Sequence, residues 1–321
     1  MRLAVPPIDP AALAGWDTAA GVAELGGETM GTGWRVRLAA PPADLAPLRA
    51  ALEAALDGVV AEMSHWQPGS HLSRFNRAPA GSWTALPSAF ATVIAVALEV
   101  ADQSDGAFDP TVGELTALWG FGPEPVAAPP APAAIVAALA RGGWRRLAFD
   151  APARRLRQPG GLRLDLSGIA KGYAVDRLAE MLAAHGHHHA LVEIGGELAG
   201  RGLRPDGDPW WVELETPAAA AAIAPLRVAL HQCAVATSGD YVRGRHTIDP
   251  RTGTPVPHAL AVSVIHASAM HADALATALS VVDQPARERL AERHGLAARA
   301  LVRREDEVIE WLSPTLIGMI A

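Results

Sequence analysis

Hydrophobic and polar positions follow two periods along the first third of the chain. They alternate over residues 34–39, which is typical of a half-buried strand. Leu48, Leu52 and Leu56 then recur at the spacing of one helix face, so a helix is expected up to Met63. A second apolar-periodic stretch, 88–103, follows a proline and ends at a Ser-Asp-Gly turn, which predicts another helix.

Strand-like runs dominate the second half of the chain. Two short runs, 154–158 and 162–166, flank Pro-Gly-Gly and predict a hairpin whose second strand leads into a glycine-rich turn and a helix ending near Gly186. Further strands are expected at 189–194, 210–216, 225–231, 260–266, 298–303 and 306–311, and helices at 271–282 and 286–294. Many strands with scattered helices predict an α+β fold with mixed or largely antiparallel sheets flanked by helices.

The distribution of proline suggests how the chain is divided. Residues 1–27 are expected to form an N-terminal arm, and 28–321 a single domain. A Pro/Ala-rich stretch, 120–134, is expected to be an exposed connection and a possible soft boundary within that domain.

Composition and charge exclude some classes of partner. The 321 residues contain 27 Lys and Arg against 34 Asp and Glu, a net charge of −7, without any basic block. We therefore expect no nucleic-acid partner and no stable membrane insertion, since no uninterrupted apolar stretch approaches the ~18 residues that a span needs. The start shows neither a signal peptide nor a lipobox cysteine, so we expect a cytoplasmic protein, with a periplasmic one open if the sequence is truncated. The one cysteine, Cys233, is expected in the core.

Three amino-acid types are so rare that their positions are informative. The chain has one lysine, Lys171, one asparagine, Asn76, and two tyrosines, Tyr173 and Tyr241. Because arginine otherwise supplies the positive charge, a single lysine inside a glycine-rich turn is a candidate for phosphate contact or for tight packing at a helix start.

Asp273 and Thr277 lie four residues apart in a predicted helix, so their oxygens project from one face. A carboxylate and a hydroxyl with spare coordination positions suit Mg²⁺ bound together with substrate phosphates better than zinc. The alternative is structural: the aspartate complements the helix dipole and the threonine bonds back to the preceding turn.

Two glycine-rich segments end strands. Residues 165–172, which include Gly168 and Lys171, resemble a junction whose backbone N–H groups hold an anion, or alternatively one that allows close strand-to-helix packing. A second pair, Gly195-Gly196, follows Glu193 and is a weak signal by itself.

Two further segments carry candidate chemistry. His246 is expected at a strand end, where a histidine is either a base or phosphate donor or an ordinary surface residue. Trp66, on a loop, could stack on a flat ring or fill a gap in the core.

Taken in order, seven short segments resemble the ApbE-type FAD:protein FMN transferases. The resemblance covers roughly residues 28–282. It rests on Met30-Gly31-Thr32 and on residues 63–76, 105–122, 165–176, 193–198, 237–253 and 272–279. It implies a tunnelling-fold-like architecture for the domain. It also implies an enzyme that uses Mg²⁺ to break the pyrophosphate of FAD, its substrate, joins FMN to a Thr or Ser hydroxyl of an acceptor flavoprotein, and releases AMP.

Residue by residue, the resemblance implies a site. Asp273 and Thr277 would bind Mg²⁺ together with the carbonyl of Ala170, His246 would lie near the scissile phosphate, and Lys171 beside the phosphates. Either His246 or Asp273 would accept the proton of the attacking hydroxyl. The FAD site would be lined by Met30, Thr32, Trp66, Asp109, Gly168, Lys171, Tyr173, Glu193, Gly195, Gly196, Ser238 and Gly239.

Three functions remain open at this point. The first is transfer of FMN to an acceptor with a Ser/Thr-Gly-Ala-Thr-like segment. The second is Mg²⁺-dependent FAD pyrophosphatase activity, which gives FMN and AMP. The third is FAD binding without turnover. The sequence does not separate them, because the nucleophile comes from outside the chain.

Overall fold

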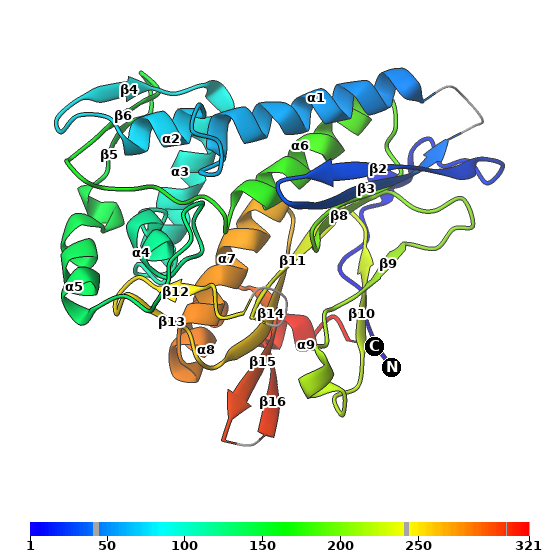
Figure 1. The fold of residues 1–321 in the computed structure, drawn as a ribbon. Helices are drawn as coiled ribbons and strands as arrows, with labels where there is room; N and C mark the ends of the chain where they lie inside the picture. The colour runs from blue at the N-terminus through cyan, green and yellow to red at the C-terminus, as the bar shows by residue number, and fades with distance from the viewer. Residues whose placement is uncertain (41–44, 241–243, 306, 321) are drawn as a thin grey trace.

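An eight-stranded antiparallel sheet forms the centre of the computed structural model, which describes residues 1–40, 45–240, 244–305 and 307–320 (Figure 1). Its strands, in spatial order, are β16 (Glu307–Leu312), β15 (Ala297–Arg304), β14 (Ala259–His266), β11 (Cys233–Gly239), β8 (Glu197–Arg201), β7 (Ala190–Ile194), β3 (Thr32–Ala40) and β2 (Gly21–Thr29). Every neighbouring pair is antiparallel. The sheet therefore needs only short connections where consecutive strands pair, as in β2–β3, β7–β8 and β15–β16.

Three smaller sheets surround this one. They are β1 (Arg2–Ala4), β10 (Leu226–Leu230) and β9 (Trp210–Glu213); β4 (Trp83–Ala85), β6 (Arg155–Arg157) and β5 (Ala148–Asp150); and β12 (Ile248–Asp249) with β13 (Thr254–Pro255). The α-helices are α1 (Ala46–Met63), α2 (His71–Asn76), α3 (Ser88–Gln103), α4 (Gly113–Leu118), α5 (Pro132–Arg141), α6 (Ala170–Ala184), α7 (Ala269–Val281), α8 (Gln284–Arg293) and α9 (Pro314–Ile317). Three 3₁₀ segments are η1 (Pro10–Leu13), η2 (Trp144–Arg146) and η3 (Ala218–Ala220).

The central sheet is buried on both faces. Helices α6 and α7 pack together against one face, with α1 and α3 beyond them (Figure 1). The β1–β10–β9 sheet packs on the other face through contacts of β10 with β8 and β11. Strand β11 shows the consequence: Ala234 and Ala236 point to the helical core, whereas Cys233 and Val235 point to the core beneath β10.

The predicted α+β class with largely antiparallel sheets is confirmed. The strongly periodic stretches form α1, α3, α7 and α8 close to their expected bounds. The predicted hairpin at 154–166 is wrong: β6 pairs with β4 and β5, and residues 162–166 form no strand beyond a single bridge from Arg163 to Val112. The apolar residues of 162–166 face the core without a ladder partner, so they gave a strand-like pattern.

The first residues of the chain take part in the central sheet, through β2, and in the β1–β10–β9 sheet, through β1. The boundary expected after residue 27 falls inside β2, which pairs with β3 from Gly21 to Thr29. Strand β1 runs parallel to β10, and Ala4 forms a bridge with Ile320. In the connection expected at 120–134, helix α5 already begins at Pro132. Within the described part of the chain, no helix is both long enough and apolar enough to cross a membrane.

Candidate active site

One end of the central sheet gathers the predicted site segments. The turn Met30-Gly31 joins β2 to β3, and the turn Gly195-Gly196 joins β7 to β8 at the same end, because Trp34 pairs with Ile194. A side-chain carbon placed on Gly195 would lie 2.8 Å from Cγ2 of Thr32, so the two turns touch. Both glycines have positive φ, +60° and +102°, which a two-residue hairpin turn requires.

Two helices that pack on this sheet, α6 and α7, carry the predicted metal ligands, and a carboxylate of α6 fixes the start of α7. Asp176 of α6 accepts hydrogen bonds from the Ser268 hydroxyl (2.6 Å) and from the backbone N–H groups of Ala269 (2.8 Å) and Met270 (3.0 Å). These groups form the first turn of α7, whose N–H groups have no partner within the helix. Sequence reasoning missed this role because the partners are more than 90 residues apart.

Asp273 lies on the buried side of α7 and is only 3% exposed. Its Oδ2 accepts a hydrogen bond of 3.0 Å from the backbone N–H of Gly172, at the start of α6. Burial raises the pKa of this carboxyl, while the positive charge of Lys171 opposes the rise. Gly172 allows the close approach: a Cβ there would lie 2.3 Å from the carbonyl oxygen of Ala269.

Thr277 follows one turn later on the same helix face. Its hydroxyl lies 3.0 Å from that of Ser238 on β11. A residue predicted to bind FAD is therefore within hydrogen-bond distance of a predicted metal ligand. Gly168 lies against the same hydroxyl, since a Cβ there would come within 2.9 Å of it. A side chain at 168 would therefore fill the space beside Thr277, and glycine keeps that space open.

Lys171 forms an ion pair with Glu197, the first residue of β8. Glu197 is 2% exposed, and its Oε2 has no hydrogen-bond partner among the described residues. Burial raises the pKa of Glu197 to about 7, against the lowering effect of Lys171, and the charge of Asp273 adds to the rise. Sequence reasoning placed Glu197 in a motif but gave it no role. No sequence pattern links the two residues, because they lie 26 positions apart and meet only through the packing of α6 against β8.

The loop with Trp66 is held over the glycine-rich junction. Trp66 is 60% exposed, so it does not fill a gap in the core. Its neighbour His65 lies 3.6 Å from the carboxylate of Asp165. Asn76 holds the backbone of Leu164 by two bonds, donating to its carbonyl (2.9 Å) and accepting from its N–H (2.7 Å). The only asparagine thus positions the segment that leads into α6.

Asp109 has a visible structural role. Its Oδ1 accepts from the N–H (2.7 Å) and hydroxyl (2.6 Å) of Thr111, and its Oδ2 accepts from the N–H of Trp144 (3.1 Å). Burial raises the pKa of Asp109 against these bonds. The preceding Phe108 contacts the Gly168 position, at 3.5 Å from a Cβ built there. Asp109 therefore shapes the loop beside the junction, and a contact with FAD stays a prediction.

The remaining predicted residues are distributed around this centre. Met30 and Tyr173 are half-buried and pack against the main core, and Glu193 is half-buried on β7. His246 is half-buried, with Nδ1 3.0 Å from the carbonyl oxygen of Gly244 and its ring 6.3 Å from that of Phe121. Its place at a scissile phosphate stays a prediction. Tyr241, part of the same motif, lies outside the described residues.

The oxygen groups at this centre fit a hard cation bound with its substrate. Within the described ranges no three or more His, Cys, Asp and Glu side chains gather as a metal cluster. The predicted donors are instead one buried carboxylate, Asp273, the Thr277 hydroxyl on the same helix and the backbone carbonyl of Ala170, and their binding of a metal stays a prediction. Such a set leaves positions for phosphate oxygens, as Mg²⁺ sites usually do.

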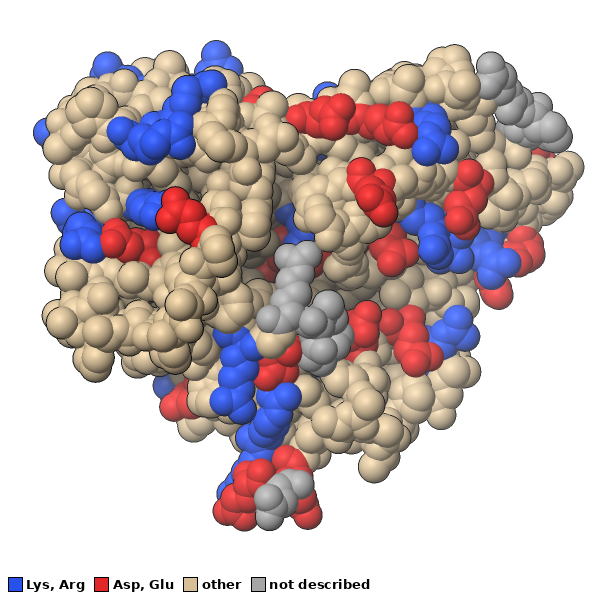
Figure 2. Space-filling view, in the orientation of Figure 1, with Lys and Arg blue, Asp and Glu red and all other residues tan. Residues whose placement is uncertain are grey.

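Figure 2 shows that this face of the molecule is hollowed near its middle, with charged groups visible inside the hollow. The fold and the site define a class of protein: an α+β protein with a buried oxygen-donor centre at a helix start that suits an anion and a divalent cation. Comparison with known proteins names the family. A model of the ApbE family matches residues 30–300, and the chain belongs to that family.

Relatives and solved structures agree with this assignment. The chain is 35% identical over 315 residues to the FAD:protein FMN transferase of Vibrio cholerae, covering 94% of this chain and 93% of the relative. It is 35% identical over 305 residues to that of Klebsiella pneumoniae, covering 90% and 87%. The structure of the flavin transferase ApbE from Vibrio cholerae superposes with a TM-score of 0.88 at 34% identity, covering 94% of this chain and 99% of the other. The apo flavinyl transferase ApbE of Pseudomonas stutzeri gives 0.86 at 36% identity, covering 94% and 97%.

Proposed function

We propose that this protein is an FAD:protein FMN transferase, which moves FMN from FAD to a Thr or Ser hydroxyl of an acceptor flavoprotein and releases AMP in a Mg²⁺-dependent reaction. One observation carries the proposal: the buried Asp273 carboxylate and the Thr277 hydroxyl, one turn apart on α7, both face the glycine-rich segment at the start of α6, at Gly172 and Gly168 respectively. The names of relatives that align over most of the chain support it.

The bond changes define what the site must do. The acceptor hydroxyl oxygen forms a bond to the FMN phosphorus, the bond from that phosphorus to the bridging oxygen breaks, and AMP leaves with this oxygen. Bound at Asp273, Thr277 and the Ala170 carbonyl, Mg²⁺ would neutralise charge on the pyrophosphate. The hydroxyl proton goes to a base, His246 or Asp273, and such assistance contributes roughly 10²–10⁴ in rate.

The chain's own groups bind and orient the substrate. The ammonium of Lys171 lies near enough to Asp273 to act on its charge, so it can also hold phosphate oxygens of a substrate bound there. The exposed ring of Trp66 offers a surface on which the isoalloxazine can stack. Glu197 holds the ammonium of Lys171 in place.

An assay with FAD, Mg²⁺ and an acceptor domain carrying a Ser/Thr-Gly-Ala-Thr segment tests the proposal. The acceptor's mass and the release of AMP are measured together. Labelled acceptor with AMP is the expected result. AMP with free FMN would indicate a pyrophosphatase instead, and neither product would indicate an FAD-binding module.

A further inference from the structure

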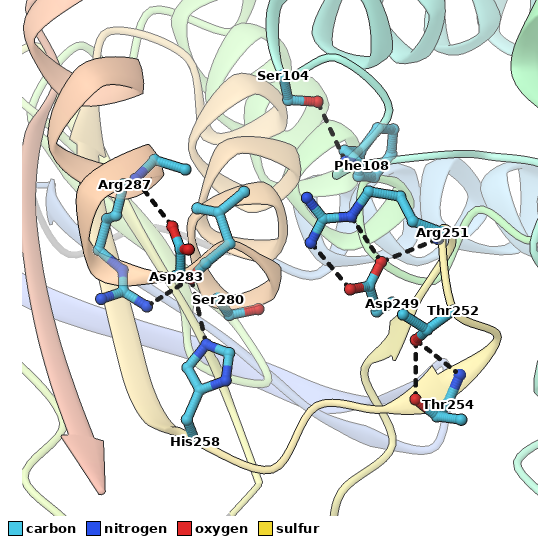
Figure 3. Close-up of polar contacts among 12 residues, drawn as sticks. Ser104, Phe108, Asp249, Arg251, Thr252, Thr254, His258, Ser280, Asp283 and Arg287 are labelled. Carbon is cyan, nitrogen blue, oxygen red and sulfur yellow. Dashed lines mark hydrogen bonds and ion pairs between the residues drawn. The ribbon is translucent and has the colours of Figure 1, made fainter. Parts of the chain in front are cut away.

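A cavity of about 500 Å³ lies beside the proposed active site and contains none of the residues predicted to bind FAD. Its walls are the β12–β13 hairpin on one side and the junction between α7 and α8 on the other. Figure 3 shows Asp249, Arg251, Thr252 and Thr254 on the hairpin, with His258 and Asp283 at the helix junction. Its size is within the range of ligand pockets in proteins.

The cavity continues the face of α7 that carries the proposed metal ligands. Val281 lines it and follows Thr277 by four residues, as Thr277 follows Asp273. On a helix these three residues form one stripe, with about 6 Å of axial rise between successive members. The opposite wall includes Asp249, three residues after His246. One wall therefore belongs to the helix that carries Asp273, and the other begins two residues after His246.

The walls are held in place by their own bonds. Arg287 is 1% exposed and donates to the carbonyl oxygens of Leu279 and Val282, both at 2.9 Å, which fixes the end of α7 to α8. His258 reaches the same Val282 carbonyl at 3.2 Å. On the hairpin, Trp119 donates to the carbonyl of Gly253 at 2.8 Å. Because these bonds fix the walls, the cavity is formed before a ligand binds. Binding therefore costs little free energy for ordering the walls.

The chemistry of the lining excludes the two halves of FAD. The lining contains no Trp, Tyr or Phe, and its one aromatic ring is the imidazole of His258, so a flavin or adenine ring has little surface on which to stack. Two arginines and two aspartates cancel in charge, and one edge of the Arg251 guanidinium, formed by Nε and Nη2, is already bonded to Asp249 (2.9 and 2.8 Å). A pyrophosphate would need surplus positive charge. What remains is a polar rim over Pro255, Val256 and Ala286, which suits an uncharged peptide with small side chains.

We propose that this cavity binds the acceptor protein, taking the segment next to the hydroxyl that receives FMN. The inference rests on the proposed function. A Ser/Thr-Gly-Ala-Thr segment has the small, uncharged side chains that the lining suits. Because the cavity lies within two helical turns of Thr277 and Asp273, a chain lying in it can present a hydroxyl a few residues away to the phosphate.

Substitutions on the two walls test this. Ala286 is the third residue of α8, where a glutamate is favoured by the helix dipole, so Ala286→Glu fills the cavity without weakening the helix. Thr254→Arg does the same from the exposed hairpin wall. Ala134→Glu is the matched control, since Ala134 is the third residue of α5, is also half-buried and lies outside the lining. The probe is the same acceptor domain, with FAD and Mg²⁺, and the thermal midpoint confirms folding.

Both cavity variants are expected to raise the KM for the acceptor by about tenfold or more, about 1.4 kcal/mol. The dissociation constant for FAD should stay at the wild-type value, and the control should transfer normally. An unchanged acceptor KM in both folded variants would overturn the inference, as would a parallel loss of FAD affinity. If the wild-type protein labels no acceptor at all, the proposed function itself fails, which is a different outcome.

Discussion

At the scale of single residues, the site depends on charges kept away from water. Asp273 and Glu197 are 3% and 2% exposed. The positive charge of Lys171 acts on both carboxyls and opposes the rise in pKa that burial causes in each. Two carboxylates and one ammonium leave an excess of negative charge, and burial makes such an excess costly. A divalent cation at Asp273 would reverse that balance and would prepare the site for a pyrophosphate.

Asp273→Asn is expected to abolish transfer, because the cation loses its only carboxylate ligand. The free energy of unfolding should not fall, since the substitution removes a buried charge while keeping its shape. Transfer rate, Mg²⁺ binding by titration calorimetry and urea unfolding are the three measurements. Full transfer in this variant, with Mg²⁺ still bound and removable by a chelator, would contradict the assignment.

Glu197→Gln removes the negative charge that Glu197 contributes to its ion pair with Lys171. We expect FAD affinity or turnover to fall by roughly tenfold or more, as is usual when a charged hydrogen bond is lost. Lys171→Arg should also weaken FAD binding or turnover, because a planar guanidinium cannot occupy the place of a compact ammonium. Dissociation constants from flavin fluorescence and single-turnover rates distinguish binding from chemistry. Wild-type values in both variants would show that the pair is only structural.

At the scale of elements, long periodic segments could be predicted and short ones could not. Helices α1, α3, α7 and α8 follow from their apolar spacing. Strand β2 begins at Gly21, within the residues 1–27 whose prolines predict an arm, and it pairs along its whole length with β3. The pairing of Asp273 with Thr277 was visible as a four-residue spacing. The Lys171–Glu197 and Asp176–Ser268 contacts were not, because they depend on how α6 meets β8 and α7.

The contact between α6 and α7 can be tested at one glycine. Gly172→Ala would place a carbon 2.3 Å from the Ala269 carbonyl, so the helices must separate and the bond from residue 172 to Asp273 must lengthen. We expect a loss of about 1–3 kcal/mol in stability together with reduced FAD turnover. Gly58→Ala in α1 is the control: nothing lies within 4 Å of its Cβ, and alanine there should add about 0.5–1 kcal/mol. Equal effects in the two variants would be inconsistent with close packing at 172.

At the scale of the whole molecule, residues from the two ends of the chain close one side of the fold. Arg2 and the buried Arg299 both donate to Glu310 on β16, at 2.6–2.8 Å. Burial alone would raise the pKa of Glu310, but the bonds from the two arginines lower it below its ordinary value. A carboxyl with a lowered pKa in the folded state stabilises the protein above its unfolded pKa, about 4.3, and loses that effect as the pH falls further.

Glu310→Gln should therefore lower the free energy of unfolding at pH 7 by about 2 kcal/mol, since it breaks ionic hydrogen bonds. As the pH falls below about 4.3 the difference between the variant and the wild type should shrink, because the unfolded wild-type carboxyl takes up its proton first and the folded carboxyl, whose pKa is lowered, only at still lower pH. Urea unfolding across pH 3–7 measures both. A difference that stays constant over this range would show that the charge of Glu310 contributes nothing.

Asp176 has a consequence for how the site responds to thermal motion. One carboxylate on α6 fastens the first turn of α7, and these two helices carry between them every proposed ligand of the ion. The ligands are thus expected to fluctuate as one rigid body rather than as two. Heating or denaturant should then dismantle the centre in a single cooperative step, and slow amide-hydrogen exchange at Ala269 and Met270 would report its opening.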